Sequence, residues 1–154
     1  MKRVIRTVVA SLLALSLLLS LISCSTDRDA DDILFEFCSS YPLESEVYYS
    51  LSEDSVSVYR SYELMTDILG DECDLPEEYA IVVHSKLNTV SEIAVLVTRD
   101  SSQRARLTEL FCDRIAFLES FLDHEGFILR RRDLIIYGFV SDKDRAVRIF
   151  EDIL

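Results

Sequence analysis

The sequence predicts an α+β fold in which a mainly antiparallel sheet, in the order ββαββα, carries two helices on one face. Two observations predict it: apolar, β-branched runs come in two pairs, and an amphipathic helical stretch follows each pair. A third is a further helical pattern near residue 30, before the first pair. The chain has 154 residues and is 49% apolar, which suits one domain with a sizeable core. We therefore expect a single domain over 30–154, best defined over 78–154.

The first predicted helix carries apolar side chains at helical spacing, from Ile33 through Phe37 to Tyr41, and Pro42 ends it. A serine-rich segment follows, in which the alternation over 55–59 predicts a short edge strand. The pattern over 64–69 then predicts a short helix that ends at Gly70. This part of the chain has no steady period.

The signals are clearer from residue 78 onward. The runs 79–84 and 93–98 predict a hairpin, and the runs 127–130 and 134–140 predict a second one that turns at 131–133. Asp100 with Gln103 resembles a capping box, and it precedes an apolar stripe from Leu107 to Leu122. Ser141 or Asp142 is expected to cap a last helix over the stripe 146–153. Both late helices are expected on the same face, with the first helix completing the cover.

The two halves of this region resemble each other. Residues 93–105 and 134–146 each run from an apolar strand to Asp, Arg and Ala, with one residue of slippage. The pattern is that of a duplication, or of two examples of a common local solution.

The N-terminal leader has the proportions of a secretory signal peptide. Lys2, Arg3 and Arg6 precede an apolar run over 7–22, which is 16 residues long. A membrane-spanning helix needs about 20 apolar residues. The run is therefore short for a permanent span.

The leader ends at Leu21-Ile22-Ser23-Cys24, which resembles the lipobox of bacterial lipoproteins. The resemblance implies cleavage after Ser23 and a diacylglyceryl group on the Cys24 thiol. It divides the chain into a signal peptide over 1–23, a lipidated cysteine and polar tether over 24–29, and the domain. Two acyl chains anchor a protein stably where one is marginal. The lipobox resemblance further implies that the protein is held on the outer face of the cytoplasmic membrane. The alternatives are an uncleaved N-terminal anchor and an ordinary secreted protein with a chance cysteine.

The charge excludes one class of partner. The chain has 16 basic and 28 acidic residues. Three of the basic residues lie in the leader, so the remainder has 13 basic residues against 28 acidic ones, a net charge of −15. Such a surface repels nucleic-acid phosphate and anionic lipid headgroups. We expect no nucleic-acid partner.

Besides Cys24, the chain has Cys38, Cys73 and Cys112, which permit at most one disulfide. Their spacing does not suit zinc. Cys38 and Cys112 lie in helical apolar patterns and are expected to be buried, whereas Cys73 lies in a polar loop and is expected to be exposed. His84 and His124 are isolated in the sequence and predict no metal site.

The sequence shows no catalytic motif. With Gly70, Gly126 and Gly138 as its only glycines, the chain has no phosphate-binding loop and no dinucleotide fingerprint. It also has no G-x-S-x-G or S-x-x-K nucleophile motif. We expect no cofactor and nominate no catalytic residue. An envelope hydrolase with dispersed catalytic residues stays an alternative.

Residues 71–78 contain five carboxylates, which makes a calcium-responsive module a further alternative. The segment lacks the ligand spacing and the central glycine of an EF-hand loop. A solvated acidic loop is the interpretation that we favour.

Arg130, Arg131 and Arg132 form the one basic cluster of the acidic domain. Three guanidiniums at a hairpin turn suit a carboxylate, a phosphate or an anionic wall polymer. Arginines at a turn more commonly keep a hairpin end soluble. These three arginines are our candidate partner contact.

With its lipobox and its ββαββα region, the chain resembles a family of short lipoproteins of Gram-positive bacteria, known as a domain of unknown function. The matching segments are 92–97, the helix that leads to Leu122, and 133–142. The resemblance implies export and anchoring, and no activity. The function that we expect is therefore a membrane-anchored, extracytoplasmic module that binds a protein or a polymer of the cell envelope.

Overall fold

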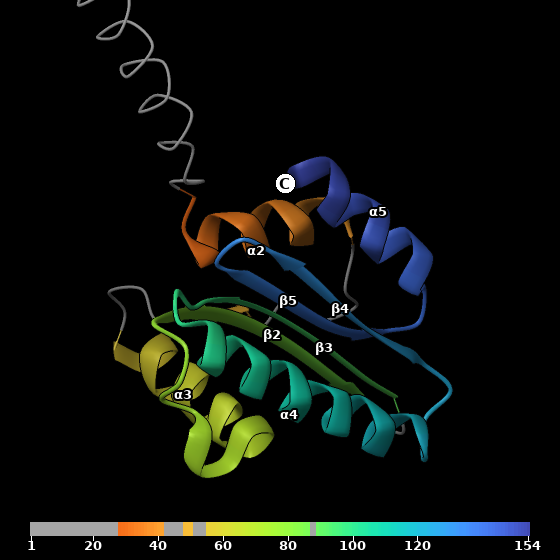
Figure 1. Ribbon diagram of the computed structural model, residues 1–154. Coiled ribbons are helices and arrows are strands. Elements are labelled where there is room, and N and C mark those ends of the chain that lie inside the picture. Colours follow the sequence, from red (N-terminus) through yellow and green to blue (C-terminus); the bar gives the residue numbers. More distant parts are fainter. Residues whose placement is uncertain (1–27, 42–47, 51–54, 87–88) are drawn as a thin grey trace, which may run out of the picture.

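The computed structural model describes residues 28–41, 48–50, 55–86 and 89–154. Figure 1 shows three layers, with one antiparallel sheet between helices above and below it. The elements are α2 (Ala30–Ser40), β1 (Tyr48–Ser50), α3 (Ser55–Leu69), η1 (Gly70–Glu72), β2 (Glu78–Lys86), β3 (Thr89–Val97), α4 (Ser101–Glu119), β4 (Glu125–Arg131), β5 (Leu134–Val140) and α5 (Lys143–Ile153). The α+β class is confirmed.

The sheet has five strands in the order β1-β2-β3-β5-β4, and every neighbouring pair is antiparallel. Both predicted hairpins are present, and the order ββαββα from β2 to α5 is the predicted one. The two hairpins meet through β3 and β5. All seven residues of β5 are buried, because helices cover both faces of the sheet at this strand.

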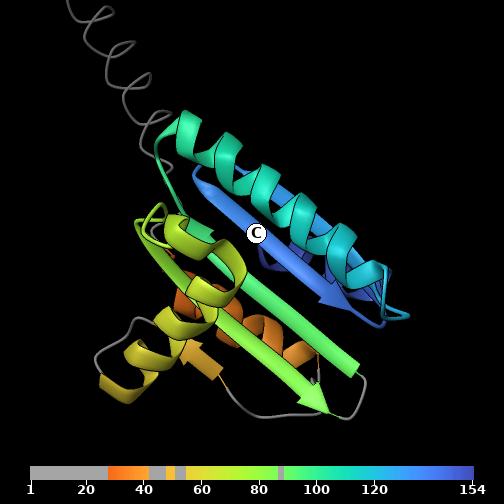
Figure 2. The same cartoon turned by 90° about the horizontal axis from the view of Figure 1, so that it is seen from below.

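The predicted placement of both late helices on one face is wrong. α5 packs with α2 on one face of the sheet, whereas α4 packs with α3 on the other (Figures 1 and 2). We name the two interiors the α2–α5 core and the α3–α4 core. Val97 and Val140 end their strands facing the α2–α5 core. Three residues (98–100) then lead to α4 and two (141–142) lead to α5, so the repeats differ in link length and in the face that their helices cover.

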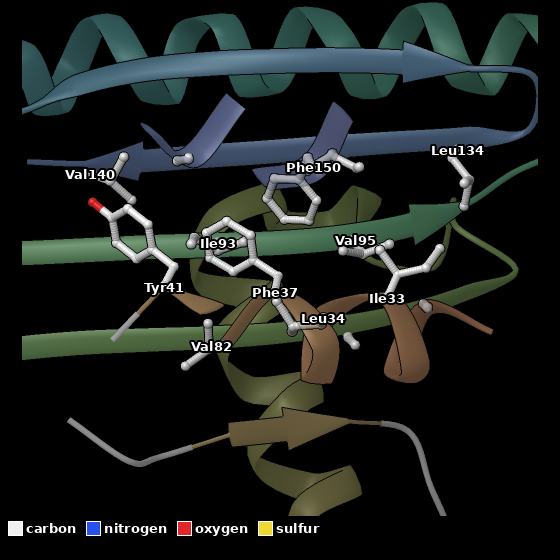
Figure 3. Close-up of a cluster of buried hydrophobic side chains, with 14 of the residues drawn as sticks. Ile33, Leu34, Phe37, Tyr41, Val82, Ile93, Val95, Leu134, Val140 and Phe150 are labelled. Atoms are coloured by element: carbon white, nitrogen blue, oxygen red, sulfur yellow. The ribbon is translucent and has the colours of Figure 1, made fainter. Parts of the chain in front are cut away.

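Aromatic stacking organises the α2–α5 core (Figure 3). The Phe37 ring is fully buried and lies 4.1 Å from the ring of Phe150 and 5.2 Å from that of Tyr41, centroid to centroid. Such offset stacking adds to the free energy gained from burying the rings. It joins α2 directly to α5, although the two helices are far apart in the sequence.

The N-terminal half of the domain agrees with the sequence in part. The first helix ends at Ser40, shortly before Pro42, as predicted. The predicted edge strand over 55–59 is wrong, because these residues begin α3. The edge strand of the sheet is β1. The buried residues Ser61, Met65 and Leu69 recur every four positions, which is a helical period that a five-residue window cannot show.

Both late helices begin at predicted caps. The Asp100 carboxylate accepts hydrogen bonds from the backbone N–H groups of Ser102 and Gln103. The Gln103 side chain does not close the capping box; it accepts instead from the Thr98 hydroxyl. Asp142, rather than Ser141, caps α5 by accepting from the Arg145 N–H.

Candidate interaction site at the arginine turn

The predicted cleavage and lipidation sites, Ser23 and Cys24, lie outside the described residues. The first described residue, Arg28, already belongs to the domain. Its guanidinium donates to the carbonyl of Ile153 at 2.9 Å and forms an ion pair with Glu36. The next residue, Asp29, accepts the first backbone hydrogen bond of α2. In the sequence, residues 25–27 lie between Cys24 and this contact.

We name Arg130, Arg131 and Arg132 the arginine turn. Arg131 ends β4, and Arg132 with Asp133 makes a two-residue connection to β5, close to the predicted turn. Arg132 has φ 49°, in the left-handed region that β-hairpin turns use. The Arg132 carbonyl accepts from Arg104 of α4, and the Asp133 carbonyl accepts from the Thr98 N–H at 2.8 Å. The backbone of the turn is thereby fixed to the start of α4.

The side chains of the arginine turn point in different directions. Arg131 pairs with Leu134, which faces the α2–α5 core, and Arg130 pairs with Ile135, which faces the α3–α4 core. Directly paired residues of antiparallel strands share a face, so these two guanidiniums leave the hairpin on opposite faces. Guanidiniums that point in different directions suit an extended anionic surface better than one small anion.

The charges of the arginine turn are unpaired. All three side chains are exposed, and none of the guanidiniums forms an ion pair or a hydrogen bond within the described ranges. The neighbouring arginines differ: Arg99 pairs with Glu77 at 2.8 Å, and Arg104 lies 3.7 Å from Asp133. The turn is therefore free to bind an anion from outside the chain.

The structure also contains a buried polar cluster that the sequence analysis missed. Glu92 of β3 is 3% exposed and accepts from Arg114 of α4, at 2.5 Å and 3.2 Å. The Tyr137 hydroxyl donates to the same carboxylate at 2.7 Å. The hydrogen bond to Glu92 raises the pKa of Arg114, and burial followed by the Glu92 charge raises the pKa of Tyr137. The signal was a carboxylate within an apolar strand and an arginine within an apolar helix stripe.

This cluster is a structural element rather than a reaction centre. Tyr137 is fully buried, and its ring stacks on Phe111 at 4.5 Å. Arg114 and Tyr137 bond both oxygens of the Glu92 carboxylate, which is almost closed to water. It gives the hydrolase alternative no accessible acid or base.

Two of the cysteine predictions are wrong. Cys73 is buried, since η1 turns it into the α3–α4 core, and Cys112 is exposed, since it lies on the outer side of α4. Cys38 is half-buried, and burial raises its pKa to about 11. All three are free thiols.

The carboxylates of the 71–78 segment bond to different parts of the fold. Glu72 pairs with Arg106 at 2.5 Å, Glu77 pairs with Arg99, and Glu78 accepts from the Ala30 N–H. Among the described residues, no three His, Cys, Asp or Glu side chains converge as a metal site. The calcium alternative gains no support from this arrangement.

The two histidines occupy unrelated places. His84 is buried on β2 opposite Ser91, and neither ring nitrogen has a hydrogen-bond partner within the described part of the chain. His124 stacks on Phe139 with ring centroids 5.7 Å apart. Among the described residues, neither ring forms a hydrogen bond with a nucleophile or a carboxylate.

Comparison with family models, curated proteins and solved structures finds no match to this chain. The resemblance to small Gram-positive lipoproteins therefore stays a prediction. Within the described segments, no helix is both long enough and apolar enough to cross a bilayer.

Proposed function

We propose that this protein is a lipid-anchored module of the cell envelope, held on the outer face of the cytoplasmic membrane through Cys24, and that it binds rather than catalyses. The observation that carries the proposal is the contact of Arg28 with the domain. Arg28 is the first described residue that contacts the domain, four residues after the lipobox-like cysteine. This contact lies close in the sequence to Cys24, at which the mature chain is expected to begin.

The anchoring follows from the energy of acyl chains in a bilayer. Each buried methylene contributes about 0.8 kcal/mol, so the two chains of a diacylglyceryl group hold a protein on the membrane where one chain does so only marginally. The domain that they would carry has its own core on both faces of the sheet. The binding role rests on the arginine turn, the unpaired cationic feature described above.

Mass spectrometry of the mature N-terminus tests the proposal. The wild-type protein, expressed in a bacterium that makes lipoproteins, should begin at Cys24 and carry a thioether-linked diacylglyceryl group. Cys24→Ala should lose the modification and keep its leader. Cys112→Ser is the matched control, because it removes an exposed thiol elsewhere and should be processed normally. A wild-type protein with a free Cys24 thiol or an intact leader would refute the anchoring.

A further inference from the structure

We propose that the arginine turn binds the anionic lipid headgroups of the membrane that holds the protein, so that this end of the domain faces the bilayer. The inference deepens the proposed function, because it rests on the lipid anchor at Cys24. It assigns a partner to the turn and an orientation to the body.

The arginine turn and the start of α2 lie at the same end of the sheet (Figures 1 and 2). The Ala30 N–H donates to the Glu78 side chain at 2.5 Å. From Glu78, a row of paired residues crosses four strands in the order Glu78, Val97, Leu134 and Arg131. With strands about 4.8 Å apart, the row brings Arg131 within about 15 Å of the residue that holds the start of α2.

The tether is short enough to keep this end near the headgroups. Cys24 and Arg28 are four residues apart in the sequence. Fully extended, four residues span at most about 14 Å. The headgroup layer of a bilayer is itself about 5–7 Å deep. Arg28 and the start of α2 therefore cannot move far from the membrane surface, and the arginine turn, at the same end of the sheet, stays with them.

The charges favour this orientation. Three acidic groups next to the turn are engaged within the fold: Glu77 pairs with Arg99, Asp133 lies near Arg104, and Glu78 accepts from α2. Asp29 and Asp32, at the start of α2, are exposed. The guanidiniums of the arginine turn have no such partners in the described part of the chain. Each basic side chain close to an anionic leaflet strengthens binding about fivefold. An anionic surface thus attracts the turn and repels the rest of the body, whose total charge is negative.

The test is an arginine footprint on the lipidated wild-type protein, reconstituted in vesicles of phosphatidylcholine alone or rich in phosphatidylglycerol. Phenylglyoxal modifies exposed arginines, and peptide mass spectrometry reports the rate at each one. We expect Arg131 and Arg132 to react about fivefold more slowly on the anionic vesicles. High salt should remove the protection. Arg148, which is exposed on α5, is the internal control and should react equally on both.

Two variants sharpen the footprint. Arg131→Glu should reduce the protection of Arg132, because it places a carboxylate in the turn, whereas Arg148→Glu makes the same charge change elsewhere and should preserve it. Equal rates on both vesicles would overturn the inference. So would protection that arises on neutral vesicles only when inorganic phosphate or an anionic wall polymer is added.

Flotation of the same vesicles separates this inference from the proposed function. A protein that floats with both lipid compositions but shows no footprint keeps its anchor and loses the proposed orientation. A protein that floats with neither has no anchor, and the proposed function fails first.

Discussion

At the scale of single residues, Glu92 shows how the core holds a charge. A carboxylate that is 3% exposed is tolerated only where its oxygens are bonded, and here Arg114 and Tyr137 bond both of them. Such an ion pair contributes little net stability over a well-packed apolar pair, but removing one partner leaves the other buried and unpaired. The cluster joins β3, β5 and α4, so it fixes how α4 lies on the sheet.

Replacing Arg114 with methionine tests this dependence. The change keeps the aliphatic stem but leaves the Glu92 carboxylate without its cation, and we expect a loss of about 3–5 kcal/mol in the free energy of unfolding. Urea denaturation at neutral pH measures it. The double variant Glu92→Gln/Arg114→Met should recover part of the loss, because an amide is cheaper to bury than a carboxylate. A single-variant loss below about 1 kcal/mol would contradict the account.

Tyr137 should make the folded state less stable at alkaline pH. Its pKa is raised above the ordinary value of 10.0, first by burial and then by Glu92. Above pH 10 the unfolded chain releases this proton while the folded chain keeps it, so stability is complete below pH 10 and falls as the pH rises. Tyr79, whose pKa burial raises to about 12, acts in the same direction.

Tyr137→Phe should be less stable than the wild type at pH 8, because the substitution removes the hydrogen bond to Glu92. The difference should shrink between pH 10 and 11, by up to about 1.4 kcal/mol, because phenylalanine has no proton to release. Denaturant titrations at the three pH values measure it. A difference that stays constant with pH would show that Tyr137 ionises equally in both states.

At the scale of elements, the sequence predicts the hairpins and α4 well and the N-terminal half poorly. β2, β3 and β5 are long β-branched runs whose pattern fits only a strand. Residues 55–59, in contrast, alternate as a strand does but begin the helix α3. The face that each late helix covers was also missed, although the one-residue slippage between the halves reflects different link lengths. A two-residue or three-residue link decides the face through backbone geometry, which hydrophobic patterning does not encode.

Gly138 of β5 illustrates packing between elements. It pairs with Phe127 of β4, and a Cβ at this position would lie 2.3 Å from two carbons of the Phe127 ring. Gly138→Ala should therefore destabilise the protein by about 1–3 kcal/mol in urea denaturation. Adding Phe127→Leu should remove most of the clash, so the double variant should lose less stability than the two single losses combined. Simple additivity would show that the ring moves aside freely.

At the scale of the whole molecule, the arginine turn was predictable and its setting was not. Three consecutive arginines next to a predicted turn placed the cations at a hairpin end, as the structure does. The three arginines lie near the start of α2 because β3 pairs with β5 and because α2 packs on β2 and β3. These contacts join residues far apart in the sequence, and no local pattern specifies them. The total charge likewise gave no sign of three exposed arginines together at one end of the sheet.

That acidic body should make the stability depend on salt. The chain after the leader has a net charge of −15, and its mutual repulsion is relieved as the Debye length falls from about 10 Å at 0.1 M to about 3 Å at 1 M. We expect the melting temperature to rise over this range of sodium chloride. The double variant Asp144→Lys/Glu151→Lys reverses two exposed charges on α5 and should flatten the rise. A melting temperature that falls with salt would mean that surface ion pairs such as Glu72–Arg106 outweigh the repulsion.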